Sequence, residues 1–136
     1  MRINNRFLVV GLAALGVVAS AHSGFAAGVG DSVLDFNEQT HLEYMCQAEK
    51  LARDVYITLG IRHPASGIFG AIDDAEERHK CAVADVLAKY GVPDPVTNDN
   101  VGVFTGAAYG EYFTDKYTLL VELGSVTALD ALYAGA

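Results

Sequence analysis

Two glutamates and a histidine are the side chains of this sequence whose types and spacing best suit metal chemistry. Glu76 and His79 form a Glu-x-x-His unit, which on a helix places a carboxylate and an imidazole one turn apart on the same face. Glu49 lies in an earlier segment whose other residues on the same helical stripe are apolar. A carboxylate in the apolar stripe of a helix is unfavourable unless it is paired or bound to a metal. Glu49, Glu76 and His79 are therefore candidate metal ligands.

Two amphipathic helices must position these residues. The first stripe has steps of three and four: Leu42, Met45, Glu49, Ala52, Tyr56 and Leu59. The second repeats the pattern: Phe69, Ile72, Glu76, His79, Val83, Val86 and Tyr90. Asp35 and Glu38 have the spacing of a capping box, and Gly60 and Gly91 are expected to end the two helices. A short connection rich in helix breakers then predicts an antiparallel hairpin over residues 36–90.

The register of this hairpin brings the candidate ligands together. In an antiparallel pair, a contact between Leu59 and Phe69 near the turn places Glu49 opposite Glu76 and His79. Single glutamates facing Glu-x-x-His units are the ligands of carboxylate-bridged di-iron and di-manganese bundles. Oxygen ligands with imidazole favour iron or manganese.

Other interpretations of the same residues stay open. Glu49 could form a purely structural ion pair with Arg78 or His79. A second Glu-x-x-His unit, Glu38 to His41, lies close to a helix start, where we expect it to be solvated. It is not counted among the ligands.

Cys46 and Cys81 lie at the same height on the two predicted helices. A disulfide between them would clamp the hairpin in an oxidising compartment, and the alternative is two free thiols. Cys46 together with His41 and Met45 could instead suit copper(I), which prefers soft ligands.

The first part of the chain has the pattern of a secretory signal. Arg2 and Arg6 precede an apolar run, Phe7–Ala19, and small residues follow it. The run is shorter than the roughly 20 residues that span a bilayer. We expect residues 1–26 to be a signal peptide cleaved after Ser23 or Ala26, an exported protein that is periplasmic or secreted, and no stable membrane anchor afterwards.

After this stretch the chain is acidic, and its pattern predicts helices joined by loops. The full sequence has a formal net charge of −8, which disfavours nucleic acid as a partner and favours cations. Residues 91–110, rich in Gly, Pro, Asn and Asp, predict a loop. A third helix is expected at about residues 111–123, and a short fourth helix, capped by Ser125 or Thr127, through Tyr133. The fold class is therefore all-α, with one domain over residues 36–136.

Specific motifs make the sequence resemble the DUF2202 family of the ferritin-like superfamily. One stretch, Glu49–Tyr56, resembles the family's E-K-L-A-R-D-V-Y signature. Later matches follow in order: Glu76-x-x-His79-x-x-Ala82-Val83, Tyr90-Gly91-Val92-x-Asp94-Pro95-Val96, Gly102-Val103-Phe104, Gly124-Ser125 and Asp130-Ala131-Leu132. The resemblance covers about residues 38–136. It implies a ferritin-like hairpin with a shorter C-terminal helical segment, a partial four-helix bundle, and ligands at Glu49, Glu76 and His79.

The resemblance also bears on the completeness of the site. Family members continue past a Gly-Ala like Gly135-Ala136 into helices that supply a second ligand set, and a full di-metal site needs two single glutamates and two Glu-x-x-His units. We expect either a homodimer that completes the site or the remnant of one. An active site would perform O₂ or peroxide chemistry, including ferrous oxidation. The alternatives are a non-enzymatic helical binding or structural protein, and a copper-handling periplasmic protein.

Overall fold

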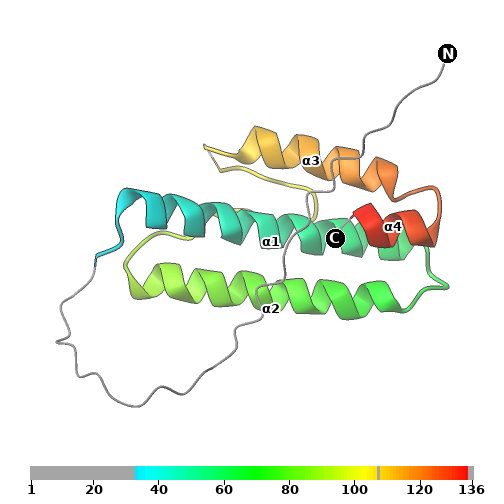
Figure 1. Cartoon of the computed structure of the whole chain (residues 1–136), viewed down its shortest axis with the longest axis horizontal. Coiled ribbons are helices and arrows are strands. Elements are labelled where there is room, and N and C mark those ends of the chain that lie inside the picture. The colour runs from blue at the N-terminus through cyan, green and yellow to red at the C-terminus, as the bar shows by residue number, and fades with distance from the viewer. Residues whose placement is uncertain (1–32, 107, 135–136) are drawn as a thin grey trace.

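The computed structural model describes residues 33–106 and 108–134, and this part of the chain is helical without strands (Figure 1). The helices are α1 (Phe36–Arg62), α2 (Ile68–Lys89), α3 (Gly110–Leu123) and α4 (Ala128–Ala134). The predicted all-α fold, with a helical hairpin and shorter C-terminal helices, is confirmed. The expected signal peptide lies outside the described residues. Within them, no helix has the length and apolar character needed to cross a membrane.

Local sequence signals explain most of the helix ends. Asp35 and Glu38 form the expected capping box, each side chain accepting the other residue's backbone N–H at 2.8 Å. Gly60 does not end α1, which continues to Arg62; instead Gly60 allows close packing, since a Cβ there would lie 3.2 Å from Cβ of Phe69. Gly91 follows α2 with a φ of 70°, a conformation that glycine adopts readily.

Helix α1 is the centre of the structure, with α2 along one side and α3 along another (Figure 1). The main core lies toward the α1–α2 connection, where α4 also packs on α1. Its buried members are Val55, Tyr56, Leu59, Phe69, Val121 and Ala131. This core fixes the antiparallel register of the hairpin, because Tyr56 stacks on Phe69 with ring centroids 6.2 Å apart.

A second, aromatic cluster joins the N-terminal half of α1 to α3. The ring of Phe113 packs against the rings of Tyr44, Phe104, Tyr109 and Tyr112, with centroid separations of 5.2–6.3 Å. This contact uses a different face of α1 from the one that meets α2. The face of α1 that carries Glu49 is therefore not covered by α3.

Candidate metal centre

The structure brings Glu49, Glu76 and His79 together between α1 and α2. One ligand atom from each residue can be chosen so that all three lie within 4.8 Å of one another. Nδ1 of His79 lies 3.0 Å from Oε2 of Glu76 and 3.5 Å from Oε2 of Glu49. Two steps produce this arrangement: the Glu-x-x-His spacing aligns Glu76 with His79 on α2, and the antiparallel register sets Glu49 opposite them.

The two carboxylates are largely buried, whereas the imidazole faces solvent. Glu49 and Glu76 each expose 17% of their side chains, and His79 exposes 58%. Burial, together with the hydrogen bond and negative charge of Glu76, raises the pKa of Glu49 to about 7, although His79 opposes this shift. Near neutral pH, the centre therefore has too little positive charge to keep both carboxylates ionised.

No cationic side chain of the described residues relieves this shortage directly. Within the described ranges, the ion pairs of Glu49 and Glu76 reach only His79, and neither glutamate pairs with a lysine or arginine. The predicted alternative of a Glu49–Arg78 pair is not formed, whereas the alternative with His79 has suitable geometry.

The donor set fits a divalent cation. Bonds of about 2.0–2.2 Å place two ligands of the same ion about 3–4 Å apart. The observed separations therefore require only small side-chain rotations, and the exposed ring of His79 has room for them. Carboxylate oxygens and imidazole suit manganese or iron better than a soft metal.

A network of buried charges lies on the other side of the hairpin, against the loop that follows α2. Lys50 and Asp54 are almost fully buried and form an ion pair, and Arg53 bonds Asp54 in turn. These side chains also bind loop backbone: Lys50 donates to the carbonyl of Asn100 at 2.9 Å, and Asp54 accepts from the N–H of Gly102 at 2.9 Å. The network thus fastens the loop to α1.

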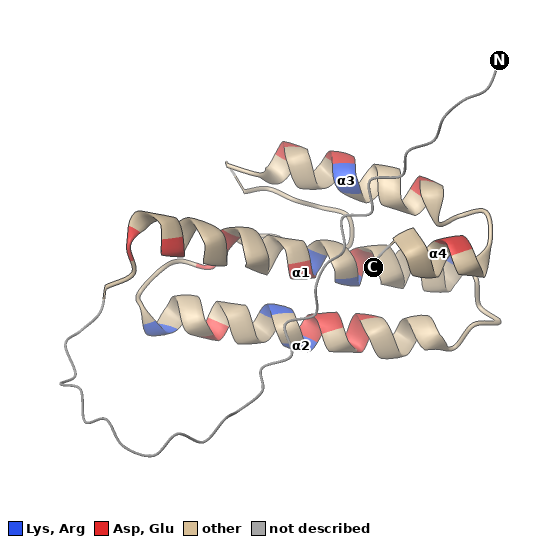
Figure 2. Cartoon of the chain, in the orientation of Figure 1, with Lys and Arg blue, Asp and Glu red and all other residues tan. Residues whose placement is uncertain are grey.

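The same network links α1 to α2. Arg53 contacts Glu77 at 2.6 Å and Asp99 at 2.9 Å, and Lys80 contacts these same two carboxylates at 3.0 and 2.7 Å. Despite the opposing effect of partial burial, hydrogen bonds from Arg53 and Lys80 hold the pKa values of Glu77 and Asp99 below their usual range. Figure 2 shows acidic and basic residues of α1 and α2 facing one another in the middle of the hairpin, with further charged residues toward its open end.

The sequence pattern did not predict this network. Lys50, Arg53 and Asp54 entered only as letters of a family signature. Their partners include backbone groups of Asp99, Asn100 and Gly102, which have no side-chain pattern to detect. Two features of the sequence could have indicated the network: several charged residues within a predicted helix, and a long loop rich in Asn, Asp and Gly.

The expected disulfide between Cys46 and Cys81 is not formed in the structure, where both cysteines are free. Cys46 is buried with Sγ 3.6 Å from Oδ1 of Asp94, whereas Cys81 is exposed with Sγ 3.4 Å from Oε1 of Glu77. Cys81 points away from α1 because it lies about 140° round α2 from Glu76. Equal height along the hairpin was therefore insufficient to predict a bond.

The residues of the copper alternative have different surroundings. His41 is exposed on α1, and Met45 exposes 40% of its surface. The thiol of Cys46 is buried against the loop, and its burial, with the charge of Asp94, raises its pKa to about 12. A thiolate ligand at Cys46 is therefore disfavoured.

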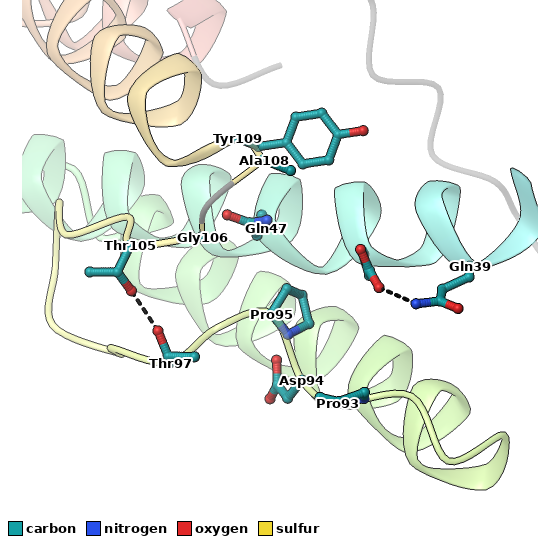
Figure 3. A pocket seen from close by; sticks show the side chains of 11 residues that line it. Gln39, Gln47, Pro93, Asp94, Pro95, Thr97, Thr105, Gly106, Ala108 and Tyr109 are labelled. Atoms are coloured by element: carbon teal, nitrogen blue, oxygen red, sulfur yellow. Dashed lines mark hydrogen bonds between the residues drawn. The ribbon is translucent and has the colours of Figure 1, made fainter. Parts of the chain in front are cut away.

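A hollow of about 420 Å³ lies between the N-terminal half of α1 and the loop (Figure 3). Gln39, Gln47, Asp94 and Tyr109 are among its lining residues. Its lining does not include Glu49, Glu76 or His79. The hollow is thus separate from the candidate metal centre.

The fold and the site define a class of protein: an α-helical hairpin with two carboxylates and an imidazole clustered at its seam. The chain belongs to the DUF2202 family, whose sequence model, described as "Uncharacterized protein domain (DUF2202)", matches residues 38–136. The match includes every residue of the centre and of the buried charge network.

One curated relative shares this region. It is the "Uncharacterized protein MJ0754" of Methanocaldococcus jannaschii, which is 43% identical over 99 residues. The match covers 73% of this chain and 51% of the relative, so the chain spans about half the length of that protein. No solved structure matches this chain.

Proposed function

We propose that this protein is an exported, ferritin-like metal-binding protein that holds iron or manganese at Glu49, Glu76 and His79. The observation that carries the proposal is the charge imbalance of the centre. Two largely buried carboxylates face each other across the hairpin, and their ion pairs within the described residues involve only one half-exposed imidazole. A divalent cation would supply the missing positive charge. Without it, the cost of burying two ionised carboxylates is relieved by protonation of one of them.

The three side chains would have different roles toward the metal. Glu76 lies next to both other residues and would be the central ligand, with Glu49 from α1 and His79 from α2 completing the set. Bound iron would supply one-electron chemistry toward O₂ or peroxide, including ferrous oxidation. The remainder of the chain would hold the ligands in register, since the Arg53–Glu77 ion pair joins α1 to α2 one residue away from Glu76.

A non-enzymatic structural role is the second candidate. It is favoured by the hydrogen bond from His79 to Glu76, which satisfies both groups without a metal. In that case the centre is a polar cross-link within the hairpin, and the protein binds no metal at this position.

Metal binding decides between these functions. We expect the purified protein to bind Mn(II) in anaerobic calorimetry and to contain iron or manganese when isolated. Glu76→Ala should lower the affinity by at least about 100-fold, because it removes the central ligand of the site. Glu111→Ala, which removes an exposed carboxylate from α3, is the matched control and should bind normally. Equal affinity in both variants would contradict the proposed function.

A further inference from the structure

The hollow between α1 and the loop has a lining that the proposed metal-binding function does not use. Its volume of about 420 Å³ is within the range of small-molecule sites. One side of it is a stripe of α1, where Gln39, Glu43 and Gln47 follow at steps of four residues and share a face of the helix. Two loop segments supply the rest, one with Pro95 and the other with Tyr109 (Figure 3). Three separate segments of the chain therefore converge on this hollow.

Contacts among the described residues hold these walls in place. The hydroxyls of Thr97 and Thr105 lie 2.6 Å apart and join the two loop segments (Figure 3). The ring of Tyr109 packs at steep angles against the rings of Tyr44 and Phe113, with centroid separations of 5.5 and 6.3 Å. The hollow is therefore formed before a ligand arrives, which lowers the cost of binding one.

The amide of Gln47 lacks a partner in the described part of the chain. Its residue exposes only 4% of its surface and lines the hollow. No hydrogen bond joins this amide to another described residue, and since no fully enclosed polar side-chain atom there is unpaired, the amide is open to the hollow. Gly106 lies directly against it, because a Cβ there would be 2.8 Å from Oε1 of Gln47. A nearly buried donor and acceptor thus faces the hollow with its hydrogen-bonding capacity unused.

Negative charge without a cation determines which ligands the hollow favours. Its lining among the described residues includes two carboxylates, Glu43 and Asp94, and no lysine, arginine or histidine. One oxygen of each carboxylate is engaged: Oε1 of Glu43 accepts from Gln39 at 2.7 Å, and Oδ1 of Asp94 accepts from the N–H of Val96 at 2.8 Å. Within the described ranges, the second oxygen of each accepts no hydrogen bond. A cation in the hollow would therefore meet negative charge that nothing nearby in the lining offsets.

This lining suits an organic cation better than a metal ion. Within the described residues, three ligand atoms of His, Cys, Asp or Glu come close enough for a metal only at the candidate metal centre. The hollow is much larger than an ion, and Pro95 and Tyr109 give it apolar surface. An ammonium group donates charge-assisted hydrogen bonds to carboxylates and is attracted to the face of an aromatic ring.

We infer that the hollow binds a small aliphatic amine. Its ammonium groups donate to the unengaged oxygens of Glu43 and Asp94, and its carbon chain lies against Pro95 and Tyr109. Gln47 supplies a further hydrogen bond and thereby gains the partner that the chain does not provide. The inference is independent of metal binding, because the lining of the hollow excludes the three candidate ligands.

Calorimetric titration of the purified protein with putrescine, a four-carbon diamine whose two charges match two carboxylates, tests the inference. We expect one molecule to bind per chain, and no binding of 1,4-butanediol, which has the same carbon chain without charge. Glu43→Gln keeps the acceptor for Gln39 but removes the charge, and should weaken binding at least about tenfold. Gln47→Met keeps the shape of the side chain but removes the amide, and should weaken binding at least about threefold. Circular dichroism establishes that the variants are folded.

Two control variants locate the bound amine. Glu122→Gln, which removes an exposed carboxylate of α3 outside this lining, should bind putrescine like the parent protein. Glu76→Ala should do so as well, and a loss of binding there would place the amine at the metal centre and overturn the inference. Absence of putrescine binding, equal binding of 1,4-butanediol, or binding that Glu43→Gln or Gln47→Met leaves unchanged would each overturn it too.

Discussion

The two sides of the α1–α2 hairpin carry charged groups of opposite character. On the loop side, three cationic side chains, Lys50, Arg53 and Lys80, meet three carboxylates, Asp54, Glu77 and Asp99. On the opposite side, at the candidate metal centre, two carboxylates meet one imidazole. The charges of the first group are balanced, so it needs no further ion. The second group has more negative than positive groups. Balance of charge, more than burial, distinguishes a structural network from a candidate ligand set.

The two sides are nevertheless built from neighbouring residues. Lys50 follows Glu49, and Lys80 follows His79. Because each residue advances about 100° round a helix, consecutive side chains point to different sides of the hairpin. The balanced network therefore fixes the register of the helices at the height where the unbalanced centre needs it. Changes to either side should show which one provides stability and which one binds a ligand.

The largest effect on stability should come from Asp54, the most central group of the balanced network. Asp54→Asn keeps the shape of the side chain but leaves the buried Lys50 and part of Arg53 without a counter-charge. Breaking a buried pair in this way costs about 3–5 kcal/mol. We expect the free energy of unfolding, measured with urea, to fall by that amount. Asp115→Asn on α3, an exposed site, should change it by less than about 0.5 kcal/mol. A small loss at Asp54 would mean that the network contributes little.

The hairpin and its register could be predicted from the sequence because periodicity determines them. The stripes through Glu49 and Glu76 give the buried faces, and breakers between them give the antiparallel connection. The third and fourth helices were also placed close to their observed bounds, and Thr127 accepts the backbone N–H of Asp130 as a cap. Gly60 was misplaced as a helix end because a glycine that allows close packing looks the same in sequence as one that stops a helix.

The cluster of the candidate ligands followed from the same register, whereas the network and the thiols did not. A register relates heights along two helices, but the bond between Cys46 and Cys81 also requires that both side chains point toward each other. The loop that binds Lys50 and Arg53 turns at Gly102, whose φ of 75° and close approach to Tyr117 determine its path. Such a path depends on tertiary packing, which a single sequence does not reveal.

A smaller effect, dependent on pH, should come from the unbalanced side. The pKa of Glu49 is raised to about 7 in the folded protein, so ionising it disfavours the folded state. Without metal, this contribution is neutral below about pH 4.5 and destabilising as pH rises toward 7. Glu49→Gln should therefore stabilise the metal-free protein by about 2–3 kcal/mol at pH 7.5 and hardly at all at pH 4.5.

Urea unfolding of the two proteins across this pH range, in chelator, measures that difference. Mn(II) should remove it, because the metal stabilises the protein that has Glu49 and not the variant. A constant difference at all pH values would show that Glu49 is not protonated in the folded protein. The comparison of the two sides would then lose its electrostatic basis.

The smallest effect on stability should come from the two thiols. Their reactivity reports which side of the hairpin is covered by the loop. Cys81 is exposed, so Cys81→Ser should change the free energy of unfolding by less than about 0.5 kcal/mol. Cys46 lies beneath the loop that the network fastens, next to Asp94 and the carbonyl of Lys80, and burial raises its pKa to about 12. Alkylation of the native protein, followed by mass spectrometry, should therefore label Cys81 and spare Cys46, which reacts only after unfolding.

The same labelling experiment sharpens the comparison when it is combined with changes to each side. Asp54→Asn should expose Cys46 to alkylation, because loosening the network frees the loop that covers the thiol. Glu76→Ala should leave the protection of Cys46 unchanged, since the centre lies on the other side of the hairpin. Labelling of neither cysteine before reduction would instead reveal a disulfide, and equal labelling of both would show that the loop does not seal this side. Protection that depends on Asp54 but not on Glu76 would establish that the balanced network holds the fold while the unbalanced centre remains available for a ligand.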